Sequence, residues 1–387
     1  MNLKNFKNKT LLMFGKSRAF SEAEFEVQIK HHNLKIVDEF SDEVELIIEG
    51  RMMSPYEQNT SEELYENQKI PSFSIDVLEK ELVAFLDADT LLMSLKLSHD
   101  KERLKSFIQN SCISDELFFK LIKMYAWSNE DFFENDDNRD VSAAFISRFY
   151  ENIERNHNVQ YATTGFIHLV SQAKTTQLLS AISELQPLKF HPKIMMGIAM
   201  SSHCDEKMQK KLHKKRDTMV DEALSCNVHL CKNLINIFLE DENLAKNMAR
   251  NLDLDEETFV LLLAYKVALA QNESLSVTMQ KSLVALKEKA VDFALATNDA
   301  LAESIVLEML KREDQDLLVA LYINKATPVS VLESAYKDGL YHASLAQNEN
   351  TPVEILYQLQ LDSRYERSVK TNAAFGKHIQ SENIGWL

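Results

Sequence analysis

The sequence has little of the material from which loops, disulfide frameworks and membrane spans are made. Only 7 glycines and 6 prolines occur among 387 residues, which favours helix as the main element. Four cysteines in so long a chain do not form a disulfide framework and fit a reducing compartment. The longest apolar run, residues 259–270, contains Lys266 and is shorter than the roughly 20 residues that span a bilayer. No secretory signal is visible at the start, so we expect a soluble, cytoplasmic protein without membrane contact.

Catalytic motifs are also missing. The chain has no glycine-rich phosphate loop, no His-Glu-x-x-His pair and no nucleophile elbow. We therefore expect neither an enzyme nor a cofactor. A net charge of −16 opposes non-specific attraction to a nucleic-acid backbone, although a local basic patch can act against that average.

The first eighty residues alternate short apolar runs with amphipathic or polar segments. The pattern predicts strands at residues 10–15, 34–38, 44–50 and 70–74, and helices at residues 20–31, 57–68 and 75–85. Apolar runs of four or five residues bounded by Gly15, Gly50 and Pro71 suit buried strands of a parallel sheet with helical crossovers. We predict a small α/β domain over residues 1–84 with a four-stranded parallel sheet.

This order of elements resembles a BRCT domain over about residues 8–84. Phe14-Gly15 closes the first strand, and the segment 70–78 leads into the last helix, as in that family. The family's glycine pair before the second strand is absent here, and its last-helix aromatic is replaced by Val77 or Leu78. The resemblance implies a protein-interaction module of the kind found in DNA replication and repair proteins.

Some BRCT domains bind phosphopeptides, through a Ser or Thr before the first-strand glycine and a lysine near the second helix. Here Phe14 precedes the glycine, and a phenyl ring cannot donate a hydrogen bond to a phosphate oxygen. The 57–68 helix supplies carboxylates rather than a lysine, which would repel a phosphate. We therefore predict no phosphopeptide binding.

A repeat of about 24 residues is the most specific pattern in the chain. Residues 348–356 (NENTPVEIL) repeat residues 324–332 (NKATPVSVL), and the asparagine recurs before and after them. An apolar residue precedes each asparagine by three positions and is usually followed by a small residue. The asparagines are Asn227, Asn251, Asn272, Asn298, Asn324, Asn348 and Asn372, with His203 in the preceding place. The apolar positions are Met200, Leu224, Met248, Leu269, Leu295, Leu321, Leu345 and Val369.

Each of these residue types has a physical role in a two-helix repeat. The apolar residue anchors a helix in a shared core, and the asparagine ends that helix by tolerating a left-handed backbone and bonding to the turn. The Thr-Pro pairs at residues 327–328 and 351–352 begin the next helix, with the hydroxyl as cap and proline in the first turn. One hairpin cannot bury its own face, so neighbours must stack. We predict a mainly α fold, with a right-handed α-solenoid over residues 85–387 that is clear from about residue 200.

The last unit resembles a leucine-rich repeat variant, one of the HEAT-like helical repeats. Units of that family run Pro, Leu, Leu, Asp, aromatic, Arg, Val and Asn. The corresponding residues here are Pro352, Leu356, Leu359, Asp362, Tyr365, Arg367, Val369 and Asn372. The resemblance covers about residues 298–375, and the segment 110–117 suggests that repeats begin directly after the first domain. Some members carry an iron–sulfur cluster, but this chain has no cysteine cluster to hold one.

Two clusters of side chains invite a binding role. Cys204, Cys226, His229 and Cys231 could meet as zinc ligands if successive repeats stack, but Cys204 and Cys226 are more simply small buried hydrophobes. The second cluster is the basic run Lys207, Lys210, Lys211, Lys214, Lys215 and Arg216. It is either a solvated helix face, which we favour, or a patch for an anionic partner.

These observations favour a non-enzymatic adaptor or scaffold. The solenoid groove and the BRCT-like head would each bind a partner protein, in a pathway of DNA replication or repair that the head's resemblance implies. The alternative is a helical-repeat protein that binds DNA directly through the basic run 207–216.

Overall fold

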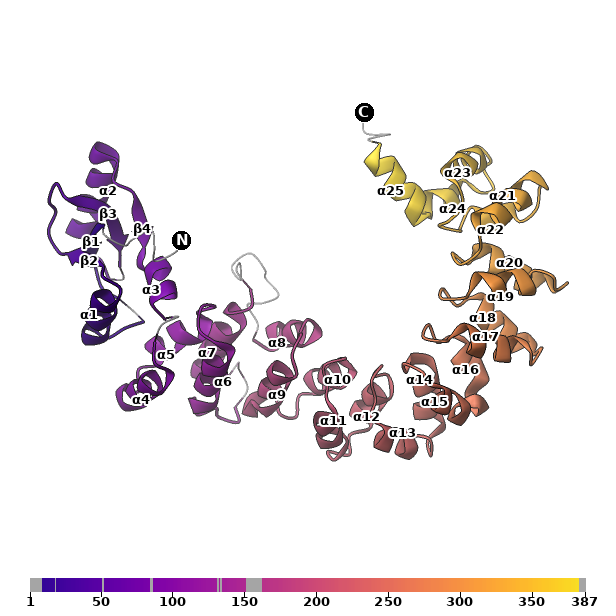
Figure 1. Ribbon diagram of the computed structural model, residues 1–387, viewed down its shortest axis with the longest axis horizontal. Coiled ribbons are helices and arrows are strands. Elements are labelled where there is room, and N and C mark those ends of the chain that lie inside the picture. Colours follow the sequence, from indigo (N-terminus) through magenta and orange to yellow (C-terminus); the bar gives the residue numbers. More distant parts are fainter. Residues whose placement is uncertain are drawn as a thin grey trace. The chain divides into compact units, whose positions relative to one another are not determined.

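The computed structural model describes residues 9–17, 19–50, 52–83, 86–130, 132, 134–150 and 162–382. The protein is mainly helical, with a small four-stranded parallel sheet near the N-terminus (Figure 1), so both predictions are confirmed. The chain forms two compact units, Met1–Ile198 and Ala199–Leu387. The predicted boundary at residues 84–85 falls outside the described residues. Across the described ranges, no helix combines the length and apolar character that crossing a bilayer requires.

The sheet of the first unit has the strand order β2-β1-β3-β4, and every neighbouring pair is parallel. Its strands are β1 (Thr10–Phe14), β2 (Lys35–Val37), β3 (Val44–Glu49) and β4 (Ser72–Ser74). Adjacent residues of the central strands, Leu11 with Leu12 and Ile47 with Ile48, are fully buried, as expected where helices cover both faces. The covering helices are α1 (Glu22–His31), α2 (Pro55–Gln68) and α3 (Ile75–Val83).

The described residues that follow the sheet in the first unit are mainly helical. They are α4 (Ala88–Ser98), α5 (Lys101–Gln109), α6 (Asp115–Met124), α7 (Asp136–Ser147), α8 (Ala162–Ser171), α9 (Thr176–Glu184) and α10 (Pro192–Met200), which runs into the second unit. Arg103 of α5 ties these helices to the sheet region, because its buried guanidinium donates to Ala19 O (3.1 Å) and Ser94 Oγ (2.8 Å). The same guanidinium forms an ion pair with Glu24 of α1.

The second unit consists of two alternating sets of short helices (Figure 1). The anchor helices are α12 (Thr218–Ser225), α14 (Glu242–Asn251), α16 (Lys266–Ala270), α18 (Lys289–Ala296), α20 (Gln315–Ile323), α22 (His342–Leu345) and α24 (Glu366–Thr371). The intervening helices are α11 (Glu206–His213), α13 (Lys232–Phe238), α15 (Glu256–Leu261), α17 (Val277–Val284), α19 (Glu303–Met309), α21 (Val329–Lys337), α23 (Val353–Gln360) and α25 (Ala373–Ser381). From α12 to α22, each anchor helix packs against the next anchor helix.

The predicted anchor residues lie in the core of this unit, with one exception. Leu224, Met248, Leu269, Leu295, Leu321, Leu345 and Val369 are all 0% exposed. Met200 was wrongly assigned, because its side chain is 54% exposed while the preceding Ala199 is fully buried. At that end of the pattern the buried positions are shifted toward the N-terminus.

The same side-chain hydrogen bonds recur along the second unit at six asparagines, which we call the asparagine ladder: Asn227, Asn272, Asn298, Asn324, Asn348 and Asn372. The Nδ2 group of Asn324 donates to Ala296 O and Asn298 O, both at 2.8 Å, and its Oδ1 accepts from the Ala326 N–H at 2.7 Å. The other members bond in the same way to two carbonyls of the preceding turn and to the N–H two residues ahead. The ladder therefore fixes the register between successive turns.

Two details of the predicted helix ends are wrong. Asn324 and Asn372 have φ of −67° and −69°, so the asparagine acts through its amide and not through a left-handed backbone. The hydroxyls of Thr327 and Thr351 do not cap the next helix, which begins after a proline in the N-cap position. Each hydroxyl instead donates to a carbonyl at the end of the preceding helix, Leu321 O (2.6 Å) or Leu345 O (2.7 Å).

Asn251 was predicted as a repeat asparagine but does not join the ladder. Its Nδ2 donates to Asn247 O within its own helix, at 2.8 Å. At this turn the Asp253 N–H donates to Val228 O, at 3.0 Å, so the backbone itself connects neighbouring turns. The shorter spacing of 21 residues to Asn272 coincides with this departure.

Candidate interaction surface

One apolar position lies at the surface in each of three consecutive anchor helices, α16, α18 and α20. Two residues before the buried anchors Leu269, Leu295 and Leu321 lie Val267, Phe293 and Val319, which are 42%, 48% and 38% exposed. Two residues correspond to about 200° around an α-helix, so these side chains leave the helix on the side opposite the core. We call Val267, Phe293 and Val319 the apolar stripe.

Charged and small residues bound the apolar stripe. The equivalent positions are Glu222 and Lys246 on the N-terminal side and Ala343 and Arg367 on the C-terminal side, and all four are exposed. Packed helices have axes about 8–10 Å apart, so neighbouring stripe positions are separated by a similar distance. The stripe is thus an apolar strip of limited length, followed by the charged Lys246 on one side and the small Ala343 on the other.

A charged pocket lies between α18 and α20, beside the stripe. Its lining is Lys287, Lys289, Asp292, Phe293, Arg312, Asp314, Asp316 and Leu317, and its volume is about 180 Å³. Asp292 is 6% exposed and forms an ion pair with Arg312, which also donates to Val284 O at 2.9 Å. Burial raises the pKa of Asp292 above its usual value, and the neighbouring Arg312 only partly offsets this effect.

The basic run occupies α11 and the turn that follows it. Lys207, Lys211, Lys214 and Arg216 are exposed, and Lys210 and Lys215 are half-buried. Lys210 forms an i,i+4 ion pair with Glu206, which raises the pKa of Lys210. The run lies on an intervening helix and not on the anchor helices that carry the apolar stripe.

The cysteine and histidine candidates do not come together as a metal site. Cys204 is buried, Cys226 and Cys231 are half-buried and His229 is exposed. Within the described part of the chain, no three His, Cys, Asp or Glu side chains are grouped closely enough to hold a metal ion. Burial raises the pKa of Cys204 to about 12, which opposes the thiolate that zinc requires.

In the sheet region, the backbone N–H of Gly15 already has an anionic partner. It donates to Glu57 Oε1 at 3.0 Å, and Glu57 Oε2 accepts from the Ser54 N–H at 2.6 Å. Hydrogen bonds from Ser54 and Gly15 lower the pKa of Glu57, which keeps the carboxylate charged. A charged carboxylate therefore lies beside the Gly15 N–H, where it would repel an anionic ligand.

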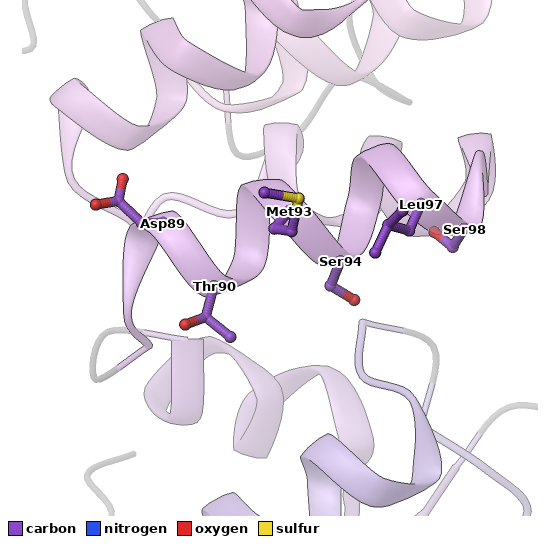
Figure 2. Close-up of a pocket in the computed structure, with 6 residues that line it drawn as sticks. All are labelled: Asp89, Thr90, Met93, Ser94, Leu97 and Ser98. Atoms are coloured by element: carbon purple, nitrogen blue, oxygen red, sulfur yellow. The ribbon is translucent and has the colours of Figure 1, made fainter.

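A second apolar surface lies on α4. Figure 2 shows six side chains of this one helix around an open depression: Asp89, Thr90, Met93, Ser94, Leu97 and Ser98. Met93 and Leu97 are 59% and 75% exposed. The described residues that line it all come from α4, whereas the pocket beside the apolar stripe is lined by residues of α18, α20 and the turns before them.

The sequence interpretation missed two buried glutamines and the charged pocket. Gln209 Nε2 donates to Cys204 O and His229 O, both at 2.9 Å, and Gln209 Oε1 accepts from the Cys231 N–H at 2.8 Å. Gln280 makes the same three bonds to Leu275 O, Ala300 O and the Ala302 N–H. A Met-Gln pair that begins three residues after each helix cap, at 208–209 and 279–280, is the signal that could have found them.

Comparison with known proteins identifies no relative: no family model, curated protein or solved structure matches the chain.

Proposed function

We propose that this chain is a non-enzymatic adaptor whose repeats form an α-solenoid and bind an amphipathic helix of a partner protein across the apolar stripe. The observation that carries the proposal is the exposure of an apolar side chain at one register position in three consecutive anchor helices. Isolated exposed apolar residues are ordinary, but an exposed apolar side chain that recurs at one position of neighbouring packed helices favours an interaction surface.

The spacing of the stripe favours a helix as the partner segment. Successive stripe positions are about 8–10 Å apart, and apolar residues at i and i+7 of an α-helix are about 10.5 Å apart. A partner helix that crosses the anchor helices could therefore place one apolar side chain near each of Val267, Phe293 and Val319. Helix-in-groove recognition uses apolar anchors of this kind.

The BRCT-like head provides a second binding module in this proposal, and its resemblance connects the adaptor with DNA replication or repair. Because Glu57 accepts a hydrogen bond from the Gly15 N–H, the head is proposed to recognise an unphosphorylated partner. The buried contacts of Arg103 with Ala19, Ser94 and Glu24 support a head that is held firmly on the adjoining helices.

The test is affinity purification with a stripe variant and a matched control. The stripe variant carries Val267→Glu, Phe293→Glu and Val319→Glu. The control carries Val277→Glu, Leu307→Glu and Val329→Glu on intervening helices, where the three side chains are 45%, 42% and 45% exposed. Burial of one apolar side chain contributes roughly 1.5–3 kcal/mol, so the stripe variant is expected to bind the partner at least about 100-fold more weakly.

The controls separate the two classes of partner. We expect the wild type and the control to recover a partner protein that the stripe variant does not recover. Nuclease treatment should not change this recovery. Equal recovery by both variants would exclude the stripe as the binding surface. Recovery that requires nucleic acid, and that is lost when Lys207, Lys211, Lys214 and Arg216 are replaced, would support direct DNA binding through the basic run instead.

A further inference from the structure

Two cationic side chains of α14 lie at one end of the apolar stripe. Lys246 has the same register position in α14 as Val267 has in α16, and these two anchor helices pack against each other. Arg250 follows Lys246 by four residues, so both side chains lie on one face of α14. Both residues are exposed, and we call them the basic pair.

A hydrogen bond between neighbouring turns holds the guanidinium of Arg250 beside the stripe. Arg250 Nε donates to Gln271 Oε1 at 2.9 Å. Gln271 follows Val267 by four residues and therefore lies next to it on the helix surface. Among the described residues, the two terminal nitrogens of Arg250 have no hydrogen-bond or ion-pair partner. Their fork matches the two oxygens of a carboxylate.

The charges around the basic pair favour one carboxylate and not several. Glu242 forms an ion pair with Lys246, so this face of α14 keeps the charge of Arg250. The register position beyond Lys246 is Glu222, which would repel a second carboxylate. At the other end of the stripe the next position is Ala343, which carries no charge. The position directly beyond the stripe is thus cationic at one end and uncharged at the other.

We propose that Arg250 binds a carboxylate of the partner helix, from an Asp or Glu that lies about five to seven residues beyond the apolar residue on Val267. This span corresponds to the distance of about 8–10 Å between packed helices. The inference rests on the proposed function, because the carboxylate belongs to the helix that binds the apolar stripe. It adds a specificity rule: the acidic side chain lies at one end of the partner's apolar series, and that end lies on α14.

A displayed peptide library tests this rule with a defined probe. The peptides are alanine-rich helices of about 30 residues that carry three leucines spaced seven apart, and the positions beyond the first and the last leucine are randomised. The full-length protein is the bait, and a peptide is retained when the stripe variant does not bind it. We expect the wild type to select Asp or Glu beyond one terminal leucine and no charge beyond the other.

Variants assign the acidic preference to Arg250. Arg250→Glu should select Lys or Arg at the same end of the peptide. With a peptide selected on the wild type, Arg250→Gln should weaken binding about threefold to fivefold, as expected for an exposed charge pair. The matched control Lys281→Gln, an exposed cation on α17, should change the Kd by less than about 1.5-fold.

A double-mutant cycle separates a direct contact from a structural role of Arg250. Replacing the acidic residue of the peptide by glutamine should weaken binding to the wild type as much as Arg250→Gln does. Combining both changes should then cause no further loss. A purely structural effect of Arg250 would weaken the acidic and the neutral peptide equally, which would overturn the inference.

The library result also separates failure of the basic pair from failure of the stripe. Peptides that depend on the stripe but have no acidic preference at either end would exclude the carboxylate site and leave the stripe as the binding surface. An unchanged acidic preference with Arg250→Glu would mean that the stability of the peptide helix selects the acid. Absence of any peptide that depends on the stripe would contradict the proposed function, and this inference with it.

Discussion

Removing one rung of the asparagine ladder should destabilise the second unit far more than removing an asparagine outside it. Asn324 is 5% exposed, and its side chain bonds to Ala296 O, Asn298 O and the Ala326 N–H. Asn324→Ala leaves these three backbone groups without that partner, and each buried group left unsatisfied costs about 1–3 kcal/mol.

The expected total is about 3 kcal/mol, because not all three groups lose their full stabilisation. The Asn298 carbonyl also accepts from the Leu301 N–H at 3.2 Å, so its loss is partial. The remaining cost falls mainly on the Ala296 carbonyl and the Ala326 N–H. Against a typical domain stability of about 5–15 kcal/mol, this is a large fraction.

The matched control is Asn251→Ala. The side chain of Asn251 donates to Asn247 O within its own helix, and Asn251 lies in the last turn of α14, where alanine has the higher helix propensity. The free energy of unfolding of the Asn251→Ala variant should differ from that of the wild type by less than about 0.5 kcal/mol. Urea unfolding followed by circular dichroism measures both variants. A difference between them smaller than about 0.5 kcal/mol would refute a structural role for the ladder.

Three further predictions concern other parts of the chain. Arg103→Ala should lower the free energy of unfolding by about 3–5 kcal/mol because it leaves buried partners uncompensated, whereas the exposed Arg139→Ala should have little effect; urea unfolding measures both. Because burial raises the pKa of Asp292, the folded state holds its proton more tightly than the unfolded state. The wild type should therefore lose stability relative to Asp292→Asn as pH rises from about 3.5 through that raised pKa. A difference in free energy of unfolding between the two proteins that stays constant up to about pH 7 would contradict this. No phosphopeptide should bind the head with a Kd below about 1 mM, because Glu57 accepts from the Gly15 N–H; phosphate-dependent binding in a peptide library would show the opposite.

The periodic and apolar features could be predicted from the sequence because they repeat. Buried strands bounded by glycine and proline predicted the parallel sheet, and the spacing of Asn324, Asn348 and Asn372 predicted equivalent turns that the ladder bonds confirm. A spacing rule, however, cannot say which groups a side chain will meet. Asn251 satisfies the rule but bonds within its own helix, and a backbone hydrogen bond from Asp253 to Val228 connects the turns at that point instead.

The candidate surface was less accessible to sequence interpretation. The apolar stripe depends on which side of each short helix faces the core, and the charged pocket depends on Asp292 and Arg312, which are 20 residues apart and meet only after α18 and α20 pack. The basic run was visible because its members are adjacent in sequence. Adjacency in sequence revealed the basic run, while the pocket came from residues that the packing brings together.

The central claim is that the asparagine ladder holds successive turns in register. Its most direct test is hydrogen exchange at the loop amides that donate to the Oδ1 atoms of the ladder. The amides of Ala300, Ala326 and Asn350 lie in turns, yet each donates to a ladder Oδ1 at 2.8, 2.7 and 2.7 Å. We predict that exchange of these amides in the full-length protein is slowed at least about 100-fold relative to an unstructured chain, as for the neighbouring anchor helices. Exchange at the rate of an open loop at all three amides, while the helices remain protected, would contradict the ladder.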